Sequence, residues 1–99
     1  MSYRVRYTKD AKEDLERLYR FMIERDLSAA GRARHTIAKS MRFLRDFPFA
    51  CHKVLPGNPF LRELVIPFGA TGYVALFEIE DKDTVTILAL RHQREDDYR

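Results

Sequence analysis

Cysteine is almost absent from this sequence, since Cys51 is the only one among 99 residues. A single thiol excludes an internal disulfide framework and a cysteine-rich zinc site, and it is typical of a reducing compartment. The three histidines, His35, His52 and His92, fall on three different predicted elements, so their spacing does not complete a tetrahedral metal site either. We therefore expect a cytoplasmic protein that holds no metal ion.

Long apolar runs and glycine-rich loops are also missing. No stretch approaches the roughly 20 apolar residues of a membrane span, and residues 1–7 lack the apolar run of a signal peptide. Gly57, Gly69 and Gly72 are isolated turn glycines and do not form a phosphate-cradling loop. The sequence predicts neither a membrane partner nor a nucleotide cofactor, and we expect no cofactor.

The composition that remains is that of an ordinary globular protein, with 45% hydrophobic and 33% charged residues. A chain of this length supports one core, so we expect a single domain over residues 1–99. The net charge of +3 permits an acidic or nucleic-acid partner without requiring one.

The first half of the chain predicts one strand and two helices. Residues 3–7 alternate in polarity like a half-buried strand, and helical spacing then predicts a helix over about 10–25, with Thr8 or Asp10 as its N-cap. Ser28 is the N-cap candidate of a second helix that ends near residue 46. The apolar stripes are Ala11, Leu15, Leu18, Tyr19 and Met22 on the first helix, and Ala30, Ala33, Ile37, Met41 and Leu44 on the second.

The second half predicts a loop followed by three strands. Residues 47–59 contain three prolines and Gly57, which predicts a long loop without regular structure. The first of these strands is expected to begin over 61–66, the second covers 72–79, and the third covers 84–90. The order is β-α-α-β-β-β, so we predict an α+β fold with a helical hairpin packed on one side of a mainly antiparallel sheet.

The end of the last predicted strand is the strongest candidate for a functional site. It changes from an apolar run to Arg91, His92 and Arg94, with Tyr98 just beyond and Arg62 on a neighbouring strand. Guanidinium groups bind phosphate or carboxylate, and histidine and tyrosine can position protons, so the set would suit a phosphodiester site. The alternative is that a strand leaving the core simply becomes solvated.

Both helices carry surfaces that could bind a partner. The first helix is apolar over more than one face because Tyr19, Phe21, Met22 and Ile23 are adjacent, which indicates either a wide core contact or a groove for an amphipathic helix. The second helix carries a basic run that could contact nucleic acid or an acidic protein partner, or could simply be a solvent-exposed helix face. That run consists of Arg32, Arg34, His35, Lys39, Arg42 and Arg45.

The order of these features resembles the RelE/ParE superfamily of toxins from type II toxin-antitoxin systems, and ParE more than RelE. The resemblance spans essentially the whole chain. It is carried by the tyrosine-rich first strand, by Thr8, Ala11, Asp14 and Leu15 in an "sxxAxxDL" pattern, by Phe47-Pro48, by Gly72-Tyr73, and by 87–94 running into Tyr98.

This resemblance implies two alternative activities. ParE-like toxins are non-enzymatic inhibitors of DNA gyrase, whereas RelE-like toxins are ribosome-dependent mRNA endonucleases. RelE-like nucleases carry an arginine after the Gly-Tyr pair, where this sequence has Val74, and lysines on the preceding strand, where it offers Arg62 and Glu63. A further arginine near the end of the last strand corresponds here to His92. These replacements remove cations that would stabilise a phosphoryl transition state, so they favour the ParE-like activity.

The resemblance also implies partners and contact residues. We expect a ParD-like antitoxin that neutralises the toxin, gyrase as the target, and contact with DNA only through the antitoxin. The target-contacting residues are expected to be Arg91, His92, Arg94 and Tyr98, and a nuclease would use His92, Arg94, Tyr98 and Arg62. The expected antitoxin contacts are Tyr19, Met22, Arg62 and Phe77. A third possibility is a degenerate toxin that only binds its antitoxin.

Overall fold

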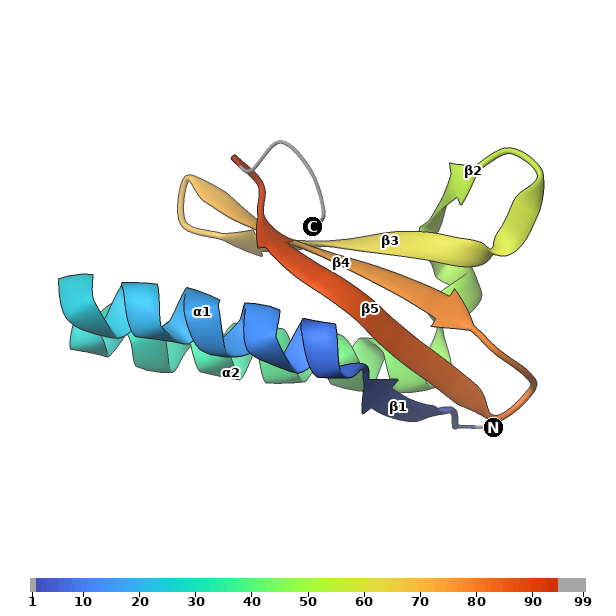
Figure 1. The fold of residues 1–99 in the computed structure, drawn as a ribbon, viewed down its shortest axis with the longest axis horizontal. Helices are drawn as coiled ribbons and strands as arrows, with labels where there is room; N and C mark the ends of the chain where they lie inside the picture. The colour runs from blue at the N-terminus through green and yellow to red at the C-terminus, as the bar shows by residue number, and fades with distance from the viewer. Residues whose placement is uncertain (1, 95–99) are drawn as a thin grey trace.

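The computed structural model describes residues 2–94, which form two helices packed on one face of a five-stranded sheet (Figure 1). This arrangement confirms the predicted α+β fold. The elements are β1 (Arg4–Tyr7), α1 (Lys9–Arg25), α2 (Leu27–Asp46), the short 3₁₀ helix η1 (Pro48–Ala50), β2 (His52–Leu55), β3 (Asn58–Phe68), β4 (Thr71–Ile79) and β5 (Thr84–His92).

The strands lie in the order β1-β5-β4-β3-β2. Strand β1 runs parallel to β5, and the other neighbours are antiparallel. The last strand is therefore an inner strand of the sheet, although it comes from the end of the described chain. Helix α1 packs across β5, which brings the second half of α1 close to the end of that strand.

Side-chain caps define where each helix begins. The hydroxyl of Thr8 accepts a hydrogen bond from the N–H of Ala11 (3.1 Å), so Thr8 is the N-cap of α1. The prediction that Ser28 caps the second helix was wrong, because Asp26 accepts from the N–H of Ala29 (3.1 Å) and α2 begins at residue 27. Asp26 also ends α1, since its own N–H bonds to the carbonyl of Met22. One residue thus separates the two helices.

The core lies between the helices and the sheet. All five predicted stripe residues of α2 are buried, and Ala11 and Leu18 are the buried members of the α1 stripe. They meet the inward side chains of the sheet, whose largest fully buried members are Phe77, Ile66, Ile87, Leu90 and Val85. Neither of these helices is long and apolar enough to cross a membrane.

The segment predicted as a long loop contains regular structure. Strand β2 occupies residues 52–55 and pairs with β3, which begins at Asn58 and not near Leu61. The prediction failed because Pro56 and Gly57 break the chain only at the turn between the two strands. Pro59 is tolerated within β3, near a register irregularity in its pairing with β2.

The pairing between β4 and β5 contains a bulge that decides which side chains face the helices. Leu76 lies opposite Ala89, but Phe77 lies opposite Ile87, so Leu88 is an extra residue on β5. Side chains alternate between the two faces of a strand, and an extra residue therefore reverses the alternation. As a result, odd-numbered residues such as Ile87 face the helices before the bulge, and even-numbered residues such as Leu90 face them after it.

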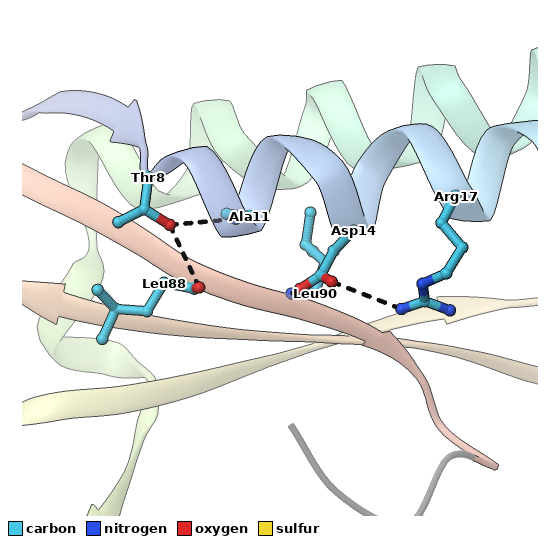
Figure 2. Close-up of polar contacts among 6 residues, drawn as sticks. All are labelled: Thr8, Ala11, Asp14, Arg17, Leu88 and Leu90. Atoms are coloured by element: carbon cyan, nitrogen blue, oxygen red, sulfur yellow. Dashed lines mark hydrogen bonds and ion pairs between the residues drawn. The ribbon is translucent and has the colours of Figure 1, made fainter. Parts of the chain in front are cut away.

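The beginning of α1 is bonded to this bulge (Figure 2). The hydroxyl of Thr8 lies 3.3 Å from the carbonyl of Leu88 and donates to it, and the carboxylate of Asp14 accepts from the N–H of Leu90 (3.0 Å). Ala11, between them, is fully buried, which leaves room only for a small side chain. The pattern that carried the family resemblance therefore holds α1 against the irregular part of β5.

Candidate partner-binding groove

A groove of about 800 Å³ lies between the second half of α1, the β3–β4 turn and the end of β5. We call it the α1–β5 groove. Its apolar lining comes mainly from α1 and β4, and its polar lining from both α1 and the strand ends. The lining residues are Arg17, Leu18, Phe21, Met22, Arg25, Ala70, Thr71, Tyr73, His92 and Arg94.

His92 is held in the groove by three neighbours. Its Nε2 lies 2.9 Å from the hydroxyl of Thr71, and its Nδ1 accepts from the backbone N–H of Arg94 at 3.1 Å. Because a backbone N–H can only donate, a neutral ring carries its proton on Nε2 and donates it to Thr71. The ring also meets Tyr73 edge to face, with centroids 5.8 Å apart. Both ring nitrogens are therefore engaged in positioning the strand end.

The groove combines an apolar floor with basic side chains. Arg17, Arg25 and Arg94 line it, and none of the described lining residues is acidic. The guanidinium of Arg25 lies 4.2 Å from the ring centroid of Phe21, a cation–π contact that orders both exposed side chains. Burial raises the pKa of the Tyr73 phenol, so this floor residue stays neutral. An amphipathic segment with acidic residues fits such a surface.

The structure separates the predicted target-contact residues. His92 and Arg94 line the α1–β5 groove, but Arg91 lies on the opposite face of the sheet, because neighbouring residues of a strand point in opposite directions. Arg91 lies across from Val74 and its guanidinium contacts the carbonyl of His92 (3.4 Å). Tyr98 lies outside the described residues.

Arg62 is remote from the groove. It pairs with Phe77, whereas His92 pairs with Tyr73, a displacement of four residues, or about 13 Å along the strands. The Arg62 guanidinium donates to the carbonyl oxygens of Pro59 (2.7 Å), Cys51 (2.6 Å) and Phe49 (3.2 Å). Arg62 is thus not brought together with His92 and Arg94 of the predicted nuclease set, because its guanidinium is bonded to carbonyl oxygens at the other end of β3.

The predicted antitoxin contacts are divided as well. Met22 lines the groove, and Tyr19 is half-buried against the core beside it. Phe77 is fully buried, so its selection as a surface contact is corrected: its side chain belongs to the core. Only one of these four predicted residues therefore lines the groove.

Several groove residues were not predicted as site residues. Phe21 was visible as part of the excess apolar surface of the first helix, and Tyr73 as part of the Gly72-Tyr73 pair. The sequence did not place Thr71 or Tyr73 beside His92, since only the strand pairing brings them there. The basic run of the second helix contributes elsewhere: Arg42 and Arg45 line a pocket of about 660 Å³ between β1 and α2. Among residues 2–94, no group of three metal-ligating side chains is placed to hold an ion.

Comparison with known proteins agrees with this architecture. The structure of a protein described as the chromosomal ParDE TA system from P. aeruginosa superposes with a TM-score of 0.71 at 19% sequence identity, covering 92% of this chain and 96% of that one. At that identity the likeness shows the fold alone. No curated protein matches the sequence. The family model for the ParE toxin of the type II toxin-antitoxin system parDE matches residues 5–97, and the chain therefore belongs to the ParE toxin family.

Proposed function

We propose that this protein is a toxin that inhibits DNA gyrase by binding to it and is neutralised by a ParD-like antitoxin in the cytoplasm. The observation that carries the proposal is membership of the ParE toxin family over residues 5–97. The activity is non-enzymatic, and DNA is contacted only through the antitoxin.

The α1–β5 groove is the proposed antitoxin site. Its floor offers Leu18, Phe21 and Met22 at helical spacing, and three arginines surround that floor. An amphipathic antitoxin segment would place apolar side chains on the floor and carboxylates beside the arginines. Such a segment would also cover His92 and Arg94, the two members of the proposed target-contact set that line the groove, so one contact would both bind the antitoxin and block part of the target-contact surface.

The placement of the predicted nuclease residues supports inhibition by binding over RNA cleavage. A nuclease needs its catalytic residues and cations gathered around the transferred phosphoryl group. The groove holds Arg17, Arg25 and Arg94, but Arg62 of the predicted nuclease set lies outside it. Here Arg62 is about four residues along the strand from the groove and bonds to three carbonyl oxygens, and Val74 follows the Gly-Tyr pair. Both ring nitrogens of His92 are already engaged. The groove therefore offers His92 little support as an acid or base.

A pair of assays on one preparation tests the proposal. Purified protein is added to gyrase while DNA supercoiling and trapped DNA cleavage are followed, and to ribosomes translating an mRNA whose cleavage is followed. We expect gyrase inhibition with intact mRNA. Codon-phased mRNA cleavage with unaffected gyrase would replace the proposal by the RelE-like activity. Failure in both assays, with antitoxin binding retained, would indicate a degenerate toxin.

The target-contact residues are tested separately. A variant with Arg91, Arg94 and Tyr98 all changed to Ala should lose inhibition of gyrase while retaining its circular dichroism spectrum. If that variant remains folded and fully inhibitory, these three residues do not contact the target.

A further inference from the structure

A second surface lies at the end of the sheet opposite to the α1–β5 groove. Four phenylalanines, Phe43, Phe47, Phe49 and Phe60, are each 42–57% exposed. They form two ring pairs: Phe43 with Phe47, centroids 5.5 Å apart, and Phe49 with Phe60, 6.2 Å apart and nearly perpendicular. We call these residues the phenylalanine cluster. Large aromatic side chains left exposed together mark interaction sites on soluble proteins.

The cluster is held on a rigid support by Arg62. This side chain spans η1 and the start of β3 through its hydrogen bonds to the carbonyls of Phe49, Cys51 and Pro59. Its guanidinium also lies 5.1 Å from the ring centroid of Phe49. The Phe49–Phe60 half of the cluster is therefore held on a fixed support, which lowers the entropy cost of binding a partner.

Two cations lie opposite each other close to the Phe49–Phe60 pair. Lys53 on β2 lies directly opposite Arg62 on β3, and like charges in that position repel each other. Glu63 is bonded to His52 (3.1 Å), and neither Lys53 nor Arg62 forms an ion pair within residues 2–94. A carboxylate from a partner would relieve this repulsion. The surface therefore fits a partner that offers apolar groups next to acidic side chains.

The same contacts argue against two other occupants. A second copy of the chain would bring two Lys53–Arg62 pairs together and increase the repulsion. A nucleic-acid base needs a free aromatic face, but one face of the Phe49 ring is covered by the Arg62 guanidinium.

We propose that the phenylalanine cluster, with Lys53 and Arg62, docks the toxin on an acidic, apolar surface of its protein target. This inference rests on the proposed function for the identity of that target. The cluster lies beside the β2–β3 turn and the groove beside the β3–β4 turn, and these turns lie at opposite ends of the sheet (Figure 1). An antitoxin in the groove therefore leaves the cluster accessible, so docking on the target and inhibition of the target are separate contacts.

The test compares a cluster variant with a matched control. Phe49→Ser with Phe60→Ser removes one ring pair, while Leu27→Ser removes a 72% exposed apolar side chain that lines neither surface. Gyrase holoenzyme is titrated with each protein, and antitoxin affinity is measured on the same samples. We expect the double variant to raise the half-inhibitory concentration about tenfold or more with the same maximal inhibition, and to bind antitoxin within about twofold of wild type. Leu27→Ser should match wild type in both assays.

Each other outcome overturns the inference in a distinguishable way. If wild type inhibits gyrase and the double variant does so at the same concentration, the cluster is not a docking site although the proposed function stands. If wild type does not bind gyrase at all, the proposed target and the inference fail together. Should the variant lose binding to a labelled oligonucleotide but keep its potency against gyrase, the cluster is a nucleic-acid surface. A lower maximal inhibition at unchanged concentration would place the cluster among the inhibitory contacts.

Discussion

The carboxylate of Asp14 on α1 accepts a hydrogen bond from the backbone N–H of Leu90 on β5, with Oδ2 and N 3.0 Å apart. This contact joins residues 76 positions apart and lies directly after the bulge at Leu88. The bond therefore fixes the end of β5, where side chains alternate between the two faces of the sheet. In this stretch His92 points toward the groove and Arg91 toward the opposite face.

Removing the Asp14 carboxylate should therefore destabilise the protein and loosen this strand. Asp14→Ala leaves the N–H of Leu90 without its acceptor, which we expect to cost about 1–3 kcal/mol in the free energy of unfolding. Asp14→Asn keeps an oxygen acceptor and should cost less. Urea denaturation measures the first quantity, and faster hydrogen exchange of the Leu90 amide reports the local effect.

Arg17→Ala is the control, because Arg17 forms a 3.7 Å ion pair with Asp14 but leaves the bond to Leu90 intact. A partly exposed pair of this kind contributes about 0–1 kcal/mol. Equal losses for Asp14→Ala and Arg17→Ala would mean that the ion pair, and not the bond to the strand, is what matters.

Two glycines should respond in opposite directions to the same substitution. A Cβ on Gly72 would lie 2.3 Å from the carbonyl oxygen of Ile66, so Gly72→Ala forces β3 and β4 apart and should cost about 1–3 kcal/mol. Gly31 lies within α2 with nothing near its Cβ position, and Gly31→Ala should stabilise the helix by about 0.5–1 kcal/mol. Thermal unfolding followed by circular dichroism measures both. A neutral Gly72→Ala would contradict the close approach of the two strands.

The pH dependence of stability should show the burial of Cys51. Burial raises the pKa of its thiol from 9.0 to about 11, partly opposed by the Arg62 cation. Between these values the unfolded chain loses the proton and the folded protein keeps it. The contribution of this group is therefore fully present below pH 9 and is lost as the pH rises toward 11.

Urea denaturation of wild type and Cys51→Ala at pH 8, 9.5 and 10.5 isolates this contribution, because the tyrosines titrate alike in both proteins. We expect the difference in unfolding free energy between the two proteins to shrink as the pH rises. A constant difference would mean that the thiol is not shielded from water. Slow alkylation of the native thiol at pH 8.5, compared with the unfolded chain, is an independent measurement.

Local periodicity predicted most of the fold, because the helices and inner strands are defined by residues close in sequence. The apolar stripe of α2 from Ala30 to Leu44 needed only the 3.6-residue repeat. Strand β2 was missed because Pro56 and Gly57 break the chain only at its turn into β3. The segment just before β2 is held by Arg62, which reaches carbonyls 11 and 13 residues earlier in the chain. Such long-range bonds leave no local pattern.

The site was predicted only in part for the same reason. His92 and Arg94 were found from the abrupt change in polarity at the end of a strand. Arg91 was grouped with them on residue type alone, although neighbouring residues of a strand point to opposite faces. The sequence of β5 does not reveal which of the two faces the helices, because that depends on the bulge at Leu88, which is held by bonds across 76 and 80 residues.

Met22 and Ile23 offer a matched test of the α1–β5 groove as the antitoxin site. They are neighbours on α1, but Met22 lines the groove, whereas Ile23 is 53% exposed and does not line it. Met22→Glu places a carboxylate on the apolar floor, where it must be desolvated and would repel an acidic partner. We expect antitoxin affinity, measured by isothermal titration calorimetry, to fall about tenfold or more, or at least 1.4 kcal/mol in binding free energy.

Ile23→Glu adds the same charge one residue away and should change that affinity by less than about twofold, since exposed charges contribute little. Circular dichroism establishes that both variants are folded, and unchanged half-inhibitory concentrations against gyrase would show that the substitutions act on the antitoxin contact alone. If the two variants weaken antitoxin binding equally, the effect is one of net charge and the groove is not the binding site. If Met22→Glu binds as tightly as wild type while folded, the antitoxin must lie elsewhere, and the basic pocket between β1 and α2 becomes the next surface to test.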